Sequence, residues 1–294
     1  AGGAQAAFDV RGSVEQVHVW NAAESAAIEL RDADDEVVEA ATTDALGSYI
    51  FRHVPAGEGY SVTVTGDGTV SPITVTSVEG SQPEQSFYDD QELHAGVNYI
   101  TTRDGTQLAV YVTLPGPEEE GPYPTVVNYS GYDPAKPGAP IEGYEGLCGA
   151  IPTLCDAPTD PSALISSLMG YATVSVNMRG TGCSGGAYDF FEDLQLLDGY
   201  DIIETAAAQP WVKHNHVGMT GLSYPGITQM FVGQMKPPSL AAITPLSVLG
   251  GTHTTTRPGG IFNKGFALNW ITNVLGKADP YGQGWEQGRV DEGD

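Results

Sequence analysis

In the stretch Val217-Gly218-Met219-Thr220-Gly221-Leu222-Ser223-Tyr224-Pro225-Gly226, small and apolar residues lead into a G-x-S-x-x-G turn. Ile227 to Val232 then follow with helical spacing. This layout predicts a strand, a sharp turn with Ser223 at its apex, and a helix. Such a turn exposes a serine hydroxyl at the end of a sheet and directs backbone N–H groups toward the group that the serine attacks.

The turn departs slightly from the G-x-S-x-G pattern of serine hydrolases, because Tyr224 and Pro225 separate Ser223 from the following glycine. Two interpretations are therefore open from these residues alone. Ser223 is either a nucleophile, or part of a tight strand–helix turn whose glycines serve packing.

The segments around this turn alternate between strand-like and helix-like patterns. An acidic start and Pro210 bound the helical segment 198–209, and a second helix is expected over 162–169. Strands alternating with helices indicate an α/β fold with a mostly parallel sheet. Ligands bind such sheets at the carboxyl ends of the strands, where Ser223 is expected. Buried strands are expected at 125–129 and 172–177, and a further strand is expected at 241–246.

The N-terminal part has a different pattern, with short alternating runs separated by turn residues between residues 8 and about 78. This pattern predicts a small all-β sandwich of the immunoglobulin-like type. We therefore expect a sandwich at 1–78, a polar and acidic linker at 79–96, an α/β domain at 97–249 and the beginning of a helical cap at 250–294.

The composition limits the classes of partner. The chain has 294 residues, of which 37 are acidic and 12 basic, so its formal net charge is -25. Nucleic-acid binding is disfavoured, because phosphate contacts need clustered Lys and Arg. There is no membrane-spanning run of about 18 apolar residues. No set of histidines and cysteines has zinc-ligand spacing, so neither a metal nor a cofactor is expected.

The three cysteines allow more than one disulfide pairing. Cys148 and Cys155 lie in one loop, and a disulfide that closes this loop is plausible in an exported protein. Pairing of either residue with Cys183 is the alternative. A secreted or cell-surface location is expected, although no signal peptide is present in this sequence.

Several motifs in order resemble one family. They are Thr102-Arg103-Asp104-Gly105, Gly131-Tyr132-Asp133, Arg179-Gly180-Thr181-Gly182, Gln209-Pro210-Trp211 and the turn around Ser223. Between about residues 97 and 270 the chain resembles the X-Pro dipeptidyl-peptidase (S15) and CocE/NonD α/β-hydrolases, which are serine esterases and peptidases. Residues 43–57 resemble carboxypeptidase-regulatory-like or Cna-B-like modules, which implies an accessory role for the N-terminal domain.

The resemblance implies catalytic roles. Ser223 would be the nucleophile, with the backbone N–H of Tyr224 and the phenol of Tyr132 as the two donors of the oxyanion hole. A phenol in a dry site is a suitable donor to a developing oxyanion. Arg179 either shapes the loop beside the site or is a structural arginine paired with a carboxylate such as Asp198 or Asp201.

A serine nucleophile also needs a base, which in α/β-hydrolases is a histidine that follows the serine and an acid along the chain. His253 is the only histidine after Ser223, and no Asp or Glu lies between them. His214 and His216 precede the serine at the wrong end of its strand. We therefore expect a chain truncated within the cap, with the catalytic acid, the base and a C-terminal β-sandwich beyond residue 294, and little or no turnover by this chain alone.

Two hypotheses remain after the sequence analysis. The first is a serine hydrolase that cleaves an ester or amide through an acyl-enzyme on Ser223; its small substrate could be an X-Pro peptide, an ester or a β-lactam. The second is a non-catalytic binding or adhesion protein built on an inactive hydrolase fold. The sequence does not indicate the oligomeric state.

Overall fold

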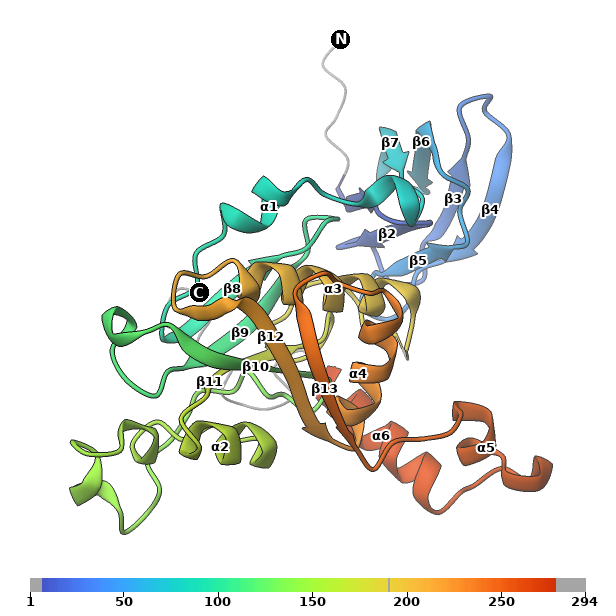
Figure 1. The fold of residues 1–294 in the computed structure, drawn as a ribbon. Helices are drawn as coiled ribbons and strands as arrows, with labels where there is room; N and C mark the ends of the chain where they lie inside the picture. The colour runs from blue at the N-terminus through green and yellow to red at the C-terminus, as the bar shows by residue number, and fades with distance from the viewer. Residues whose placement is uncertain (1–6, 190, 279–294) are drawn as a thin grey trace. The chain divides into compact units, whose positions relative to one another are not determined.

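The computed structural model describes residues 7–189 and 191–278, and the chain divides into two compact units (Figure 1). The first unit is Ala1–Pro83 and the second is Glu84–Asp294. Each has its own hydrophobic core, and they are described separately below.

The first unit consists of two antiparallel sheets that enclose an aliphatic and aromatic core. Val17, Leu30, Phe51 and Val62 in this core are completely buried. The all-β prediction is therefore confirmed, while the immunoglobulin-like assignment stays a prediction. The strands, in sheet order, are β1 (Asp9–Gly12), β2 (Gln16–Trp20) and β5 (Tyr49–Arg52), then β4 (Val37–Thr42), β3 (Ala27–Arg31), β6 (Gly57–Val64) and β7 (Gly68–Val75).

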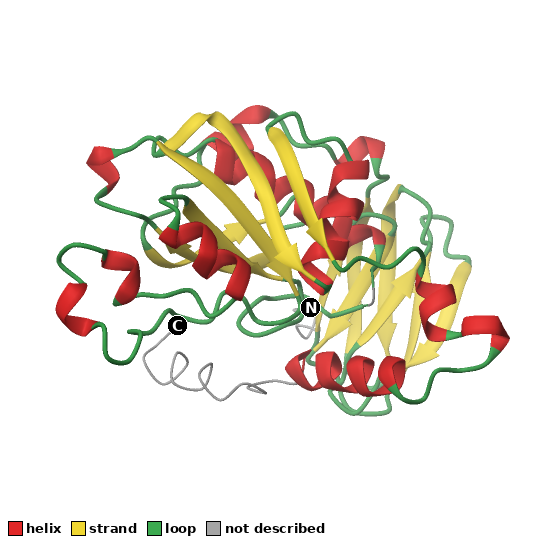
Figure 2. Ribbon diagram, turned by 60° about the horizontal axis from the view of Figure 1, so that its bottom comes forward, coloured by secondary structure: helices red, strands yellow, loops and turns green. Residues whose placement is uncertain are grey.

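The second unit is built on a six-stranded mixed sheet. The strands β10, β11, β12 and β13 are parallel, and an antiparallel pair, β8 and β9, extends the sheet beyond β11 (Figure 1). Figure 2 shows the strands in yellow with red helices packed beside them. The expected mostly parallel sheet is thus present. In sheet order its strands are β13 (Leu240–Leu246), β12 (Val212–Leu222), β10 (Tyr123–Ser130), β11 (Ala172–Asn177), β9 (Gln107–Thr113) and β8 (Gly96–Thr101).

Helices connect and cover these strands. The strand β12 runs directly into α4, as the pattern around Ser223 predicts. Asp160 caps α2 by accepting hydrogen bonds from the backbone N–H groups of Ser162 and Ala163, and Pro161 occupies the first helical position. The α-helices are α1 (Gln85–Asp89), α2 (Pro161–Leu168), α3 (Asp193–Ala207), α4 (Tyr224–Gln234), α5 (Thr252–Thr256) and α6 (Phe266–Ala278); the 3₁₀ turns are η1 (Glu79–Ser81), η2 (Glu118–Glu120), η3 (Glu145–Leu147), η4 (Pro152–Leu154) and η5 (Pro258–Gly260).

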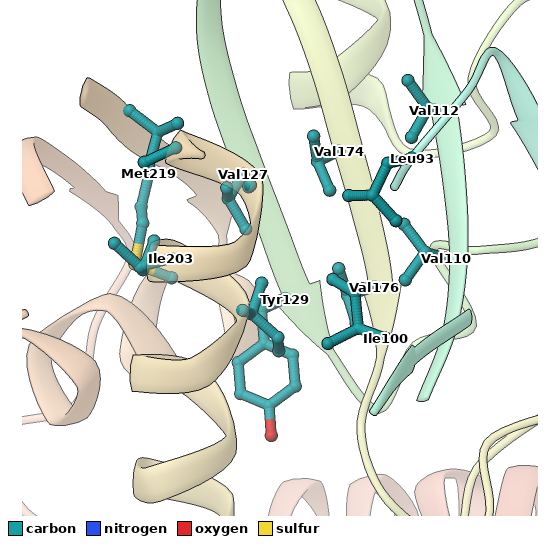
Figure 3. Close-up of a cluster of buried hydrophobic side chains, with 14 of the residues drawn as sticks. Leu93, Ile100, Val110, Val112, Val127, Tyr129, Val174, Val176, Ile203 and Met219 are labelled. Carbon is teal, nitrogen blue, oxygen red and sulfur yellow. The ribbon is translucent and has the colours of Figure 1, made fainter. Parts of the chain in front are cut away.

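The two faces of the sheet differ chemically. Val127, Val174 and Met219 pack with Ile203 of α3 in the main core, and Figure 3 shows these side chains together. The opposite face carries hydroxyl side chains, and Thr173 on it is 3.4 Å from Ser167 of α2. Burial of the aliphatic face against α3 and α4 supplies the main hydrophobic stabilisation of this unit.

The second unit begins earlier than the expected start at residue 97. Tyr88 of α1 is buried and donates a hydrogen bond to Asp201 of α3 at 2.9 Å, and Leu93 packs in the main core. Part of the expected linker, 79–96, therefore belongs to the folded α/β unit. The polar composition of this segment is typical of a linker. Its packing is not evident from the local sequence, because Tyr88 and Leu93 hydrogen-bond to Asp201 and Trp211, which lie far along the chain.

The structure also decides the cysteine pairing that the sequence left open. Cys148 and Cys155 form the disulfide, which closes a short loop that begins directly after η3 and contains η4. In the described residues, no helix combines the length and the apolar character needed to cross a membrane. The helices α5 and α6 occupy the range expected to begin the cap, and residues 279–294 of that range lie outside the described residues.

Candidate active site

Ser223 lies between β12 and α4 with an unusual backbone conformation, φ 68° and ψ -116°. Its N–H donates to the carbonyl of Leu246 at 2.9 Å, and its own carbonyl accepts from Ile227 at 2.8 Å. The first bond ties the turn to β13, and the second begins α4. The strained residue is thus fixed on both sides, as is typical of a nucleophile presented at a strand–helix turn.

The glycines of this turn are required by close backbone packing. A Cβ on Gly221 would lie 2.4 Å from the Cβ of Pro225, and a Cβ on Gly226 would lie 2.4 Å from the carbonyl oxygen of Leu246. Both contacts are far below van der Waals distance. The glycine three residues after Ser223 therefore lets α4 start directly against β13, which explains why the spacing departs from G-x-S-x-G.

The sheet brings Tyr132 to Ser223. Tyr132 follows β10 and Ser223 follows β12, and these neighbouring parallel strands end at the same edge. The phenol oxygen of Tyr132 is 3.3 Å from Oγ of Ser223, within hydrogen-bond distance. Tyr224 is the first residue of α4, so its N–H lies at the helix N-terminus, where backbone donors face a negative charge favourably. The three residues expected from the sequence to form the site thus lie together.

Tyr224 also contributes its ring, which the sequence analysis did not consider. The ring is completely buried, and its hydroxyl contacts the sulfur of Met178 at 3.0 Å and the hydroxyl of Tyr188 at 2.8 Å. Burial raises the pKa of Tyr224 well above its ordinary value, and it likewise raises the pKa of Tyr188. Both phenols therefore stay protonated at physiological pH and act as hydrogen-bonding groups, not as bases.

The loop that carries Tyr132 is held by a buried polar clamp of Asp133 and Asn177. Asp133 has a positive φ of 63° and accepts a hydrogen bond from Nδ2 of Asn177 at 2.6 Å, and Oδ1 of Asn177 accepts from the N–H of Ala135 at 2.9 Å. A Cβ on Gly182 would lie 2.1 Å from Nδ2 of Asn177. No local pattern in the sequence indicates this clamp, although Asp133 and Gly182 stand inside two of the motifs given above.

Arg179 has the structural role that the sequence analysis weighed as one alternative. Its guanidinium donates to both oxygens of Asp198, at 2.6 and 2.7 Å, and to Asp104 at 3.0 Å. Asp201, the other acid considered, instead binds Arg103 at 2.7 Å. Arg179 is buried and its hydrogen bonds go to these carboxylates, so it fixes the loop after β11.

An apolar pocket opens beside the Ser223 hydroxyl. Its walls come from the start of α4, from α5 and from α6, and they are almost entirely nonpolar. A pocket of this character favours an uncharged, apolar part of a ligand next to the reactive hydroxyl. The lining includes Ser223, Ile227, Leu249, Phe266, Ala267 and Ile271.

A base for Ser223 is missing from the part of the chain that the structure describes, where none of the six histidines hydrogen-bonds to its hydroxyl. His253 lies exposed on α5 and is not among the side chains that line the pocket. His214 and His216 lie at the beginning of β12, and Ser223 follows its end. In the described residues, the Ser223 hydroxyl thus lies beside the phenol of Tyr132 and the N-terminus of α4, and no histidine is hydrogen-bonded to it.

The match to a known family lies within the α/β unit. The sequence model of the X-Pro dipeptidyl-peptidase family, S15, matches residues 104–292. A candidate serine esterase of Mycobacterium bovis is 28% identical over 185 residues, which cover 58% of this chain and 27% of the relative. A candidate serine esterase of Mycobacterium tuberculosis has the same identity and coverage. The chain thus spans about a quarter of the length of these curated relatives.

A solved structure shows the same architecture. The crystal structure of a CocE/NonD family hydrolase from Staphylococcus aureus is 25% identical to this chain, with a TM-score of 0.50. The match covers 63% of this chain and 37% of the other. The expected α/β-hydrolase fold is confirmed by this similarity.

Proposed function

The chain belongs to the X-Pro dipeptidyl-peptidase (S15) family, and from this premise we propose that it is the part of a serine hydrolase that carries the nucleophile and the oxyanion hole. The observation that carries the proposal is the meeting of Tyr132 and Ser223, 3.3 Å apart, at a strained strand–helix turn. A purely structural turn needs neither a phenol directed at the serine hydroxyl nor an apolar pocket beside it.

The proposed reaction proceeds in two steps. In the first, Oγ of Ser223 attacks the carbonyl carbon of an ester or amide, its proton passes to a general base, and the carbonyl electron pair moves onto oxygen. The phenol of Tyr132 and the N–H of Tyr224 stabilise this oxyanion. The electron pair then returns, the bond to the alcohol or amine breaks, and the leaving group takes the proton. In the second step water, activated by the same base, hydrolyses the acyl-enzyme.

The base is supplied by residues other than those described here. Without a proton acceptor a serine hydroxyl is a weak nucleophile at neutral pH. The arrangement of Tyr132 and Tyr224 can stabilise an oxyanion, but it cannot deprotonate Ser223. The proposal therefore separates two functions: this chain binds and polarises the acyl group, and a further residue takes the proton.

The pocket supports a substrate with an uncharged, apolar group at the scissile bond. Both a prolyl residue and the acyl part of a simple ester have this character, so the proposal covers peptide and ester substrates. Export from the cytoplasm is part of the proposal and is supported by the disulfide between Cys148 and Cys155, because disulfides persist mainly in oxidising compartments.

Covalent labelling with a fluorophosphonate probe tests the proposal. We expect the complete product of the gene to be labelled, and the Ser223→Ala variant to be unlabelled. Ser247→Ala is the matched control, because Ser247 is an exposed serine that follows the neighbouring strand β13 and it should label like the unmodified protein.

Two outcomes would overturn the proposal. Equal labelling of the unmodified protein and Ser223→Ala would place the reactive residue elsewhere. Absence of any labelling, together with absence of hydrolysis of both an X-Pro anilide and a nitrophenyl ester, would favour the alternative of a non-catalytic binding protein.

A further inference from the structure

The hydroxyl of Tyr132 lies between two partners from different elements. Nε1 of Trp270, on α6, donates a hydrogen bond to Oη of Tyr132. On the other side, Oη of Tyr132 is 3.3 Å from Oγ of Ser223, a distance at which either hydroxyl can be the donor. A tyrosine hydroxyl has one hydrogen to donate, whereas an indole N–H can only donate.

This chemistry fixes the direction of the Tyr132 hydrogen. Because the indole N–H of Trp270 occupies an acceptor position on Oη, the single hydrogen of Tyr132 is left for the side of Ser223. We propose that Trp270 is a positioning residue that orients the Tyr132 hydroxyl, so that its hydrogen faces Ser223 and, during reaction, the oxyanion. This inference rests on the proposed function and adds to it a role for α6.

The placement of α6 supports this role. Ala267 is buried, and Ala267, Trp270 and Ile271 have the i, i+3, i+4 spacing of one helix face. All three line the pocket beside Ser223, whereas Leu268 is exposed and does not line it. The face of α6 that turns toward the site thus presents Trp270 to Tyr132, so that correct seating of α6 completes the oxyanion hole.

A role in packing alone is the competing explanation. The ring of Trp270 lies 6.3 Å from that of Tyr132 and 5.3 Å from that of Tyr224, both in edge-on arrangements. These contacts would persist with any aromatic ring at position 270. The substitution Trp270→Phe therefore separates the two explanations, because it keeps an aromatic ring and removes the N–H.

The kinetic test uses the complete product of the gene with an ester substrate. We expect Trp270→Phe to lower kcat by roughly tenfold with KM nearly unchanged, which is a fraction of the roughly 10²–10³-fold loss typical of removing an oxyanion donor. Trp20→Phe, in the N-terminal unit, is the matched control and should leave both constants unchanged. A rise in KM with unchanged kcat would contradict the positioning role.

A double-variant cycle shows whether Trp270 acts through Tyr132. In a Tyr132→Phe background the hydroxyl to be oriented is gone, so Trp270→Phe should change kcat by less than about twofold. An equal loss in both backgrounds would overturn the proposal, because Trp270 would then act independently of the Tyr132 hydroxyl.

A spectroscopic test of the same bond needs no activity. In ¹⁵N-labelled protein, Tyr132→Phe should move the indole N–H signal of Trp270 upfield, since the hydrogen bond to Oη is lost while the ring remains. The signal of Trp211, whose Nε1 donates to the carbonyl of Leu93 at 2.9 Å, is the internal reference and should stay in place. An unmoved Trp270 signal would overturn the inference.

The outcomes distinguish the two proposals. If Ser223→Ala abolishes hydrolysis and Trp270→Phe has no effect on kcat, the serine hydrolase stands and the inference about Trp270 fails. If Ser223→Ala retains full hydrolysis, the proposed function fails, whereas the indole signal still reports whether Trp270 orients the Tyr132 hydroxyl.

Discussion

At Ser223 the backbone has a positive φ of 68°, a conformation that costs a non-glycine residue on the order of 1–3 kcal/mol. The surrounding contacts maintain it, because Leu246 accepts the N–H of Ser223 and the glycines at 221 and 226 let the helix approach the sheet. The residue therefore shows a local cost in stability that is consistent with a function at its hydroxyl.

The strain predicts an unusual ranking of two variants. Ser223→Gly should be more stable than Ser223→Ala by roughly 1 kcal/mol, because glycine adopts a positive φ at no steric cost. The measurement is urea unfolding of both variants, followed by the fluorescence of the α/β unit. Equal midpoints would mean that the turn is not strained.

Tyr132 gives a second prediction at this scale. Tyr132→Phe should lower kcat by about 10²–10³-fold with KM nearly unchanged, because the lost hydrogen bond forms with the oxyanion and not with the bound substrate. Steady-state kinetics of the complete gene product measure it. Tyr123→Phe is the control: its hydroxyl donates to the carbonyl of Pro117 away from the site, and its loss should not change kcat.

At the scale of elements, carboxylates of α3 bind three other segments of the α/β unit. Asp198 binds Arg179 of the loop after β11, Asp201 binds Arg103 of the turn between β8 and β9, and Glu204 accepts from Ser239 before β13. Three acids along one helix thus hold three separate segments. These carboxylates are buried, so each needs its hydrogen-bonding partner to offset the cost of removing a charge from water.

This arrangement predicts a large effect of one substitution. Asp198→Asn should destabilise the α/β unit by about 3–5 kcal/mol, because it leaves the buried guanidinium of Arg179 without its bidentate partner. Asp193→Asn, at an exposed position of the same helix, should cost less than about 1 kcal/mol. Thermal unfolding of the two variants provides the comparison, and similar losses would contradict the anchoring role.

Elements that follow from local sequence patterns could be predicted, whereas contacts between distant residues could not. The turn at Ser223 and the strands of the parallel sheet follow from local patterns, and the ordered motifs placed Tyr132 at the site. The clamp of Asp133 and Asn177, the contact of Trp270 with Tyr132 and the packing of Tyr88 on α3 join residues far apart in the chain. Such pairings depend on tertiary packing, so no local periodicity indicates them.

For the molecule as a whole, the boundary between the two units lies between Pro83 and Glu84, whereas the α/β domain was expected to start at residue 97. Tyr88 hydrogen-bonds Asp201, and the carbonyl of Leu93 accepts from the indole of Trp211. Residues 84–96 therefore complete the α/β unit. The N-terminal unit, by contrast, has a separate core.

Two fragments test this boundary. A fragment of residues 84–294 should unfold at a clearly higher temperature than one of residues 97–294, because the shorter one exposes the surface that Tyr88 and Leu93 cover and leaves Trp211 and Asp201 without these partners. Circular dichroism during heating measures the difference. Equal melting temperatures would show that residues 84–96 are only a connection.

The 294-residue chain itself should show little or no ester hydrolysis, since the described part of the site offers Ser223 no base. A sensitive nitrophenyl ester assay measures this. Appreciable hydrolysis that is lost in His253→Ala would contradict the expectation and would identify His253 as the proton acceptor.

The most direct measurement of the central claim is the mass of a trapped acyl-enzyme. The complete gene product is mixed with a nitrophenyl ester, quenched in acid within the first turnover and digested for mass spectrometry. Our account predicts that the peptide containing Ser223 gains the mass of the acyl group, and that this adduct is absent from Ser223→Ala. Acylation of a different residue, or rapid hydrolysis with no adduct on the Ser223 peptide at any quench time, would contradict it.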